Sequence, residues 1–279
     1  MTRLRHLLWH TLSVLPILLA AACAIPPPAL DDSALPRLRA ASFVLLGEVH
    51  DNPSHHRLRA ALLTELLADG GPTTVVFEQM GRAEDGAIAA APRDAEAIAD
   101  AGGLDRKGWG WPLHKPLFDA AIAASARIAG GNLEAAQVRA IVRTGLPAVP
   151  ADLRPLLEGP GWSARQQQAL EREIDQGHCH ALPVAQWPAM ALAQRARDAA
   201  LAQALLSAAA AGGRAVLIAG NGHVRRDLGV PHYLRAAGVP AAQIVAFGHL
   251  EEDERNAPYD LVRVTGRTPR DDPCAAFAK

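Results

Sequence analysis

The stretch that decides the fold is Val44-Leu45-Leu46-Gly47-Glu48-Val49-His50, an apolar run that stops in Gly-Glu-x-His. A second run, Val216-Leu217-Ile218-Ala219-Gly220-Asn221-Gly222-His223, stops in Gly-x-Gly-His. Each is typical of a buried strand that opens into a glycine-containing turn and presents a histidine. Because the carboxyl ends of parallel strands meet at one crevice, we expect His50 and His223 to lie close together. Two imidazoles and a carboxylate there suit metal binding, haem binding or acid–base chemistry.

Further apolar runs extend this pattern into a sheet. The segment from Pro53 to Asp69 repeats leucine at a helical period, so the chain begins as strand, helix, strand, the unit of a parallel sheet. Asn52 or Ser54 is a candidate cap for this helix, and Gly70-Gly71 ends it. The predicted strands are short, apolar and bounded by glycine or polar residues. They are Phe43 to Leu46, Thr73 to Phe77, Ala215 to Ala219, Ile244 to Phe247 and Leu261 to Thr265.

The middle of the chain, roughly residues 81–211, is alanine-rich and shows no convincing strand. It predicts several helices, the last a long one that starts near Ala185 and ends at Gly212-Gly213. We therefore expect an α/β fold, with a mostly parallel central sheet flanked by helices and an inserted helical lid. The domain is expected to span residues 41–268, with a C-terminal tail at 269–279.

The N-terminus indicates export. Arg3 and Arg5 precede a short apolar stretch, and Ala20-Ala21-Ala22-Cys23 follows it. This is the pattern of a signal peptide at residues 1–22, and the apolar part is too short to be a transmembrane helix. The cysteine after small residues resembles a lipoprotein signal, with Cys23 lipidated and residues 23–40 forming an anchor and linker. The alternative is plain cleavage and a soluble periplasmic protein.

The bulk composition narrows the classes of function. The chain has 279 residues, a formal net charge of −1 and 49 % hydrophobic residues. That is ordinary globular composition without the basic surplus that nucleic-acid binding needs. If Cys23 is lipidated, Cys179 and Cys274 remain as a pair that an oxidising compartment would allow to form a disulfide.

Glu48, His50 and Glu78 are the leading candidates for chemistry. Glu78 follows the apolar run Val75-Val76-Phe77, and a carboxylate at the mouth of a buried strand is costly unless it is paired or liganded. The alternative is a structural role, in which Glu78 pairs with an arginine such as Arg82 and His50 is an ordinary surface histidine.

Several residues are candidates to surround this crevice. His55 is close enough in sequence to His50 to share it, whereas His56 is expected in a solvated helix turn. Arg225 and Arg226 follow His223 and are available for a carboxylate such as a haem propionate. Trp109-Gly110-Trp111-Pro112-Leu113-His114 would make a flat wall for a planar ligand, or else pack the helical lid.

Four stretches resemble the ChaN-like haem-binding lipoproteins of the Tiki, TraB and erythromycin-esterase superfamily. The first and last of them are the specific ones. They are Leu45 to His56, Val76 to Met80, Gln194 to Asp198 and Ile218 to Arg225, the last with Gly229-Val230-Pro231.

The resemblance implies a single α/β domain with a lid, a lipid anchor and haem binding in iron uptake. It also implies a homodimer that holds two haems face to face, and a role beside an outer-membrane haem or iron receptor. The expected place is the periplasmic face of a bacterial membrane. The family ligates iron through tyrosine, but this chain has only Tyr233 and Tyr259, and histidine stands at position 114 where relatives carry tyrosine. His50, His55, His114 and His223 are therefore the candidate haem-contacting histidines.

The superfamily also contains enzymes, in which the positions matching Glu48, His50, Glu78 and His223 are catalytic or bind metal. The resemblance thus leaves a second hypothesis open, a hydrolase of peptide or ester bonds that uses a divalent metal ion. Whether the protein is an enzyme stays undecided at this point, with haem binding the favoured function.

Overall fold

The computed structural model describes residues 34–159, 161–252 and 256–275. Its centre is a six-stranded sheet in the order β3-β2-β4-β1-β5-β6, in which all neighbouring strands are parallel. The expected α/β fold with a parallel sheet and flanking helices is therefore confirmed. The strands are β1 (Phe43–Leu46), β2 (Thr73–Gly81), β3 (Arg127–Asn132), β4 (Arg214–Ile218), β5 (Ile244–Leu250) and β6 (Leu261–Val264).

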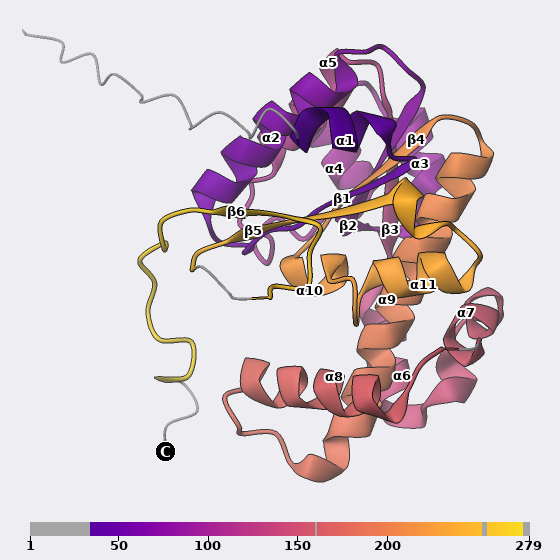
Figure 1. Ribbon diagram of the computed structural model, residues 1–279, viewed down its shortest axis with the longest axis vertical. Coiled ribbons are helices and arrows are strands. Elements are labelled where there is room, and N and C mark those ends of the chain that lie inside the picture. Colours follow the sequence, from indigo (N-terminus) through magenta and orange to yellow (C-terminus); the bar gives the residue numbers. More distant parts are fainter. Residues whose placement is uncertain (1–33, 160, 253–255, 276–279) are drawn as a thin grey trace, which may run out of the picture.

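The helices cover both faces of the sheet (Figure 1). They are α1 (Ala34–Ala40), α2 (Pro53–Leu67), α3 (Asp85–Ala90), α4 (Ala95–Ala101), α5 (Lys115–Ala123), α6 (Ala135–Thr144), α7 (Arg154–Glu158), α8 (Ala164–Gly177), α9 (Trp187–Ala210), α10 (Asn221–Val224) and α11 (Val230–Ala236). One core lies between the sheet and α1, α2, α4 and α5. The other lies between the sheet and α9 and α11, and it continues along α9 to the side chains of α6 and α7.

The alternation of side chains along β1 explains why both faces are covered. Phe43 and Leu45 belong to the core with α9, whereas Val44 and Leu46 belong to the core with α2. Successive residues of a strand point to opposite faces, so an all-apolar strand needs a helix on each side. α2 begins as the sequence predicts: the Asn52 side chain caps it by accepting the backbone N–H of Ser54 and His55.

The expectation that residues 81–211 contain no strand is wrong, because Arg127–Asn132 form β3 at the edge of the sheet. Only one of its six residues is β-branched and two are glycines, so local propensity does not reveal it. Packing requires the glycines. A Cβ at Gly131 would lie 2.6 Å from Val76 Cγ1 and 2.8 Å from Leu201 Cδ2, so α9 and β2 approach β3 too closely for a side chain.

The inserted segment therefore has two parts. Its first part supplies α3, α4, α5 and β3 to the sheet and one of its faces, and its second part forms a helical lid. The lid, made of α6, α7, α8 and the first half of α9, lies apart from the strands at the lower end of Figure 1. The second half of α9 packs on β2, β3 and β4 and joins the lid to the sheet.

Both ends of the described chain pack onto the domain. Residues 34–40, which the sequence places in the linker, form α1, and Leu38 of that helix is fully buried. Near the other end, Cys179 and Cys274 form a disulfide that ties the C-terminal segment to the turn after α8. The predicted signal peptide and Cys23 lie outside the described residues. Within residues 34–159, 161–252 and 256–275, no helix has the length and apolar character needed to cross a membrane.

Candidate functional site

The loops after β1 and β4 lie next to each other at the centre of the sheet. The chain leaves β1 toward β2 and β3 but leaves β4 toward β5 and β6, so the strand order reverses between these two strands. Open α/β sheets form ligand sites at such a reversal, outside the carboxyl ends of the strands. Glu48 and His50 follow β1, and His223 follows β4, so the structure brings these side chains to one edge of the sheet.

The carboxylate of Glu48 is the centre of a buried network. The side chain is fully buried. Its Oε1 lies 2.9 Å from Nδ1 of His50 and 3.1 Å from Nε2 of His114. Its Oε2 contacts the guanidinium of Arg59, a fully buried arginine that neutralises its charge. A buried carboxylate needs such partners, because a single uncompensated charge in this interior would be strongly destabilising.

The hydrogen bonds fix which ring nitrogens carry protons. Nε2 of His56 lies 2.7 Å from the carbonyl oxygen of His50, so the neutral ring donates there and accepts from Arg59 at Nδ1. His56 is thus buried in the network. The expectation from the sequence that it lies in a solvated helix turn is wrong. His50 donates to Glu48 through Nδ1, which leaves its Nε2 as a lone-pair donor. Burial lowers the pKa of His114 to about 2 and also lowers that of His50, so both rings are neutral at pH 7.

Glu78, at the end of β2, is the centre of a second network. It is 2 % exposed and accepts the backbone N–H of Gly220 at 2.8 Å and the guanidinium of Arg197 at 2.7 Å. Nε2 of His223 lies 3.2 Å from the same carboxylate. Nδ1 of His223 lies 2.6 Å from Oδ1 of Asp198, so this imidazole bridges two buried carboxylates.

The charges of this second network follow from its contacts. Burial opposes a charge on His223, but the carboxylates of Glu78 and Asp198 outweigh it and raise the pKa of this histidine to about 9. Burial likewise opposes a charge on Glu78, yet His223 and Arg197 hold the pKa of this carboxyl well below its ordinary value. His223 is therefore an imidazolium at neutral pH with both ring nitrogens engaged, and it is poorly placed to bind a metal ion.

The sequence does not identify two members of these networks. Asp198 lies within the family-like stretch of α9 but stands out only as one carboxylate on an alanine-rich helix that is buried on several sides. Arg59 lies among the leucines of α2 and is fully buried, and no sequence pattern marks this arginine as a partner of a buried carboxylate. Arg82, the partner that the sequence suggests for Glu78, pairs with Asp152 instead.

The two networks meet at Gly220. A Cβ on this residue would lie 2.7 Å from both Cε1 and Nε2 of His50, and 3.7 Å from Oε2 of Glu78. The backbone conformation of Gly220 is open to any residue, so glycine is required here for space alone. His50 thus rests directly on the turn after β4.

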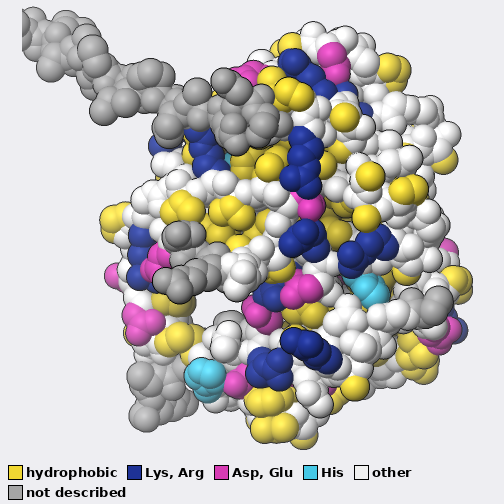
Figure 2. Space-filling view, viewed as in Figure 1, with side chains coloured by type: hydrophobic (Ala, Val, Ile, Leu, Met, Phe, Trp, Pro, Cys, Tyr) yellow, Lys and Arg dark blue, Asp and Glu magenta, His cyan; other side chains and the backbone are white. Residues whose placement is uncertain are grey.

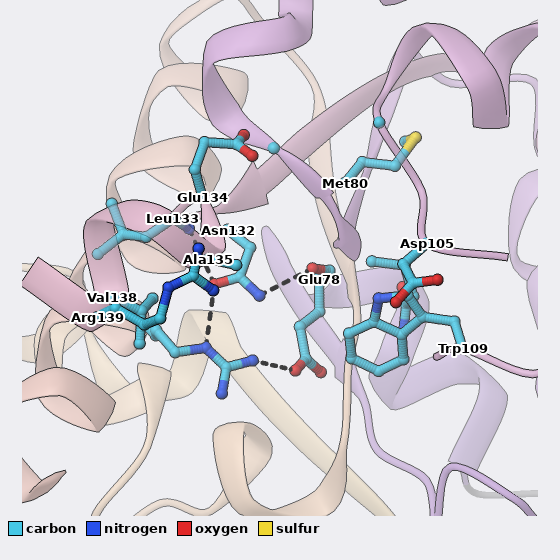
Figure 3. Close-up of a pocket in the computed structure, with 14 residues that line it drawn as sticks. Glu78, Met80, Asp105, Trp109, Asn132, Leu133, Glu134, Ala135, Val138 and Arg139 are labelled. Carbon is cyan, nitrogen blue, oxygen red and sulfur yellow. Dashed lines mark hydrogen bonds and ion pairs between the residues drawn. The ribbon is translucent and has the colours of Figure 1, made fainter. Parts of the chain in front are cut away.

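A cavity of about 420 Å³ opens beside this junction, between the end of β2, the start of α6 and Trp109. Figure 3 shows Trp109 on one side of Glu78 and the side chains of Val138 and Arg139 on the other. The ring of Trp109 lies 4.9 Å from that of His50 and nearly perpendicular to it. The His50 side chain is 48 % exposed, so one edge of its ring faces out of the buried network. The lining includes Glu78, Met80, Trp109, Asn132, Leu133, Val138, Arg139 and Arg197.

The other candidates of the Gly-Glu-x-His region and the tryptophan cluster are packed elsewhere. His55 is fully buried, with Nδ1 accepting the N–H of Val49 and Nε2 lying 2.8 Å from Oγ1 of Thr265. Trp111 donates to Glu96 and packs in the core near α5. The sequence offers two roles for the aromatic cluster, a wall for a planar ligand or packing. Trp109 lines the cavity, whereas Trp111 packs against the core.

The arginines that follow His223 are both paired. Arg225 contacts Glu173 at 2.7 Å and Asp227 at 2.9 Å, and Arg226 lies 3.2 Å from Asp260. Figure 2 shows basic and acidic side chains lying next to one another in this way on the face it presents. Arg139, by contrast, lines the cavity without an ion pair to any carboxylate of the residues described.

The two tyrosines lie away from the cavity beside Trp109. Tyr233 is fully buried beside Trp162, and the Arg195 side chain donates to its hydroxyl. Tyr259 is 9 % exposed, and its hydroxyl lies 3.3 Å from the backbone oxygen of Asn221. Neither lines the cavity beside Trp109.

The buried network contains one cluster with the donor atoms for a metal ion. Glu48, His56 and His114 bring ligand atoms within 4.8 Å of one another, and all three residues are buried. The guanidinium of Arg59 already contacts the same carboxylate. A divalent ion would have to share that carboxylate with a fixed cation at close range, so this donor set does not fit a divalent metal.

Comparison with known proteins completes the description of the site. A family model described as "Haem-binding uptake, Tiki superfamily, ChaN" matches residues 34–234. ChaN of Campylobacter jejuni, whose structure is described as showing cofacial haem binding, is 19 % identical, with a TM-score of 0.70 over 82 % of this chain and 89 % of that chain. At that identity the likeness shows the fold.

Two further solved structures are more distantly similar to this chain. A Bacillus cereus protein is 12 % identical with a TM-score of 0.45, over 85 % of this chain and 73 % of that one. An erythromycin esterase mutant in its open conformation is 13 % identical with a TM-score of 0.42, over 88 % and 81 %. No curated protein matches the chain.

Proposed function

The chain belongs to the ChaN family of haem-binding proteins, and on that basis we propose that it binds haem in the cavity beside Trp109, with His50 as the iron ligand. The observation that carries this proposal is the state of His50. Its Nδ1 is held by Glu48, its Nε2 carries a lone pair, and its ring is half-exposed between Gly220 and Trp109. When bound, the haem iron supplies the open coordination position that takes this nitrogen.

The other histidines of the site are less suited to that role. His114 and His55 are fully buried, and His223 is charged and bridges Glu78 and Asp198. His55 and His223 would each have to leave a buried hydrogen bond to reach a ligand, which costs about 1–3 kcal/mol for the group left unpaired. His114 has an unpartnered Nδ1, but that nitrogen is buried and does not line the cavity. His50 keeps its hydrogen bond to Glu48 and still offers a nitrogen.

The cavity walls supply what a flat, anionic macrocycle needs. Trp109, Leu133 and Val138 give apolar surface, and the tryptophan ring lies nearly perpendicular to that of His50. With that orientation Trp109 would offer its flat face to a macrocycle held by His50. Arg139 lines this wall without an ion pair to any carboxylate in the described part of the chain, and it can hold a propionate. Arg225 could do so only by giving up Glu173 or Asp227.

We further propose that the protein is exported, is anchored by a lipid on Cys23 and takes part in haem uptake, with a second copy of the chain and an outer-membrane receptor as partners. The Cys179–Cys274 disulfide supports export, because structural disulfides persist in oxidising compartments. Mass spectrometry of the mature chain tests the anchor: an acylated Cys23 at the N-terminus supports it, and a free N-terminus after Ala22 contradicts it.

A hemin titration tests the binding proposal. We expect a saturable Soret shift in the wild type, and a loss of affinity of about tenfold or more in His50→Ala, equivalent to about 1.4 kcal/mol. His180→Ala is the matched control, because His180 lies on the lid and its side chain is 70 % exposed. No saturable shift in the wild type would exclude haem binding. An unchanged affinity in His50→Ala, with a loss in His114→Ala, would assign the iron to the buried network instead.

A further inference from the structure

A second cavity, of about 230 Å³, lies under the helical lid. Residues of α8 and α9 line it on the lid side, and α10 and the loop that follows α10 line it on the side nearer the sheet. In Figure 1, α10 lies between the strands and α8. This cavity and the one beside Trp109 have no lining residue in common, so they are separate spaces.

The walls of this second cavity are largely apolar. Leu170 and Ile174 of α8 line it, as does Leu228 from the loop after α10. Leu170 and Leu228 belong to a small core that is separate from the two cores of the sheet. An apolar cavity of about 150 Å³ is large enough to bind benzene. The space under the lid therefore suffices for one substituted aromatic ring.

Asp198 provides a polar group in the wall of this cavity. The residue is 1 % exposed, and its Oδ1 accepts Nδ1–H of His223 at 2.6 Å. Its other oxygen, Oδ2, has no hydrogen bond to any residue in the described part of the chain. A buried carboxylate oxygen without a partner is costly, and it can only accept a hydrogen bond. It therefore favours a ligand that brings a hydroxyl or an N–H group.

The charges around the cavity favour a neutral ligand. The imidazolium of His223 already neutralises Asp198, and Arg225 is paired with Glu173 and Asp227. An anion would have to displace a carboxylate from Arg225 and would lie near Asp198. A cation would meet a carboxylate that is already paired. The cost of taking either ion out of water would thus be poorly compensated, which is not so for a neutral ligand.

We propose that this cavity binds a small neutral ligand with a ring-sized apolar body and one hydroxyl or N–H group, which donates a hydrogen bond to Oδ2 of Asp198. Phenols and indoles have this chemistry. The three apolar side chains hold the ring, and Asp198 selects the donor. The proposal is independent of haem binding, because the haem site that we propose uses none of the residues that line this cavity.

Methyl-group NMR of the full chain, without added haem, tests this site with p-cresol as the probe. We expect saturable shifts of the methyl signals of Leu170, Ile174 and Leu228, because the bound ring lies against these side chains. The methyl signals of Leu133 and Val138, which line the cavity beside Trp109, should not change. No saturable shift, or shifts confined to Leu133 and Val138, would overturn the proposal.

A matched ligand tests the role of Asp198 without altering the protein. In p-xylene a methyl group of similar size replaces the hydroxyl of p-cresol, so this ligand cannot donate to Oδ2. Because a buried carboxylate oxygen would then stay unpaired, we expect p-xylene to bind about tenfold more weakly than p-cresol, although it is the more apolar of the two. Equal affinities would show that Asp198 does not select the ligand and would contradict the proposal.

Filling the cavity provides an independent test. Gly177 in α8 and Gly222 in α10 line the cavity, and a Cβ at either position would meet nothing within 4 Å. Neither glycine has a positive φ, so both positions accept a larger side chain without backbone strain. We expect the double variant Gly177→Leu/Gly222→Leu to lower the affinity for p-cresol by about tenfold or more. Gly86→Leu, in α3 and outside the cavity, is the matched control, and an unchanged affinity in the double variant would overturn the proposal.

Discussion

Gly220 connects the two buried networks, and its lack of a side chain is what allows His50 to lie where it does. A Cβ at this position would meet the His50 ring at 2.7 Å, a distance at which the ring must move. The backbone itself tolerates alanine, so the fold should survive the change. Gly220 therefore acts on the site through space alone.

Gly220→Ala should weaken hemin binding by about tenfold or more, because it displaces the ring that we assign to the iron. Thermal unfolding should change little. Gly222→Ala, in the same turn with open space around it, is the control and should bind hemin like the wild type. Equal affinities of the two variants would show that the position of the His50 ring is unimportant.

The residues that could be predicted from the sequence are those whose place depends on a strand end. Glu48, His50, Glu78 and His223 all follow apolar runs, and parallel strands deliver such residues to one edge. Asp198 and Arg59 could not be assigned in this way, because their roles arise from helices that pack onto that edge. The partners of a buried charge are a property of the packed tertiary structure.

Among the strands, β3 is the one that the local sequence pattern does not predict. Its residues have little strand propensity, yet they pair with β2 along the edge of the sheet. Glycine at position 131 lets β2 and α9 pack closely against β3, where a larger side chain would collide with Val76 and Leu201. The other five strands are visible in the sequence as short apolar runs. Four of them are buried on both faces, whereas β6, at the edge, alternates between half-buried and exposed residues.

Gly131→Ala should lower the free energy of unfolding by about 1–3 kcal/mol, the usual effect of forcing an extra methyl group into a packed core. Urea denaturation measures the change. Gly86→Ala is the control: it lies in α3 with nothing within 4 Å of a new Cβ, and it should stabilise by about 0.4–1 kcal/mol. A neutral Gly131→Ala would mean that β3 does not pack as closely on Val76 and Leu201 as described.

At the scale of the whole molecule, buried histidines determine how stability responds to pH. Burial lowers the pKa of His55 to about 4, lowers that of His114 to about 2 and holds that of His249 well below 6.5. In the unfolded chain each titrates near 6.5. Below that pH the unfolded state binds protons that the folded state refuses, so protonation favours unfolding. Their contribution is complete above about pH 6.5 and is lost progressively below it.

The free energy of unfolding should therefore fall between pH 6.5 and about pH 4, by up to about 1.4 kcal/mol per pH unit for each histidine that stays neutral. His223 has the opposite sign: its folded pKa of about 9 gives stability that is complete below 6.5 and lost as the pH rises through 9. The urea concentration at the midpoint of unfolding, measured across this pH range, reports both the acidic and the alkaline loss of stability. His249→Phe should make the acidic limb shallower by one histidine, and a flat profile from pH 7 to about pH 5 would contradict the assignment of neutral buried rings.

The position of the His50 side chain depends on features from several parts of the fold. The sheet reversal, the glycine at position 220 and the buried Glu48–Arg59 pair together leave His50 as a half-exposed histidine next to Trp109. Nε2 of this ring is the nitrogen that we assign to the haem iron.

Pulsed electron paramagnetic resonance of the ferric haem complex, prepared from protein with isotope-labelled histidine nitrogen, detects the iron ligand itself. We expect a hyperfine coupling from a labelled histidine nitrogen bound to the iron, lost in His50→Ala and kept in His114→Ala. A complex without that coupling, or one that keeps it in His50→Ala, would contradict the assignment of His50 as the iron ligand.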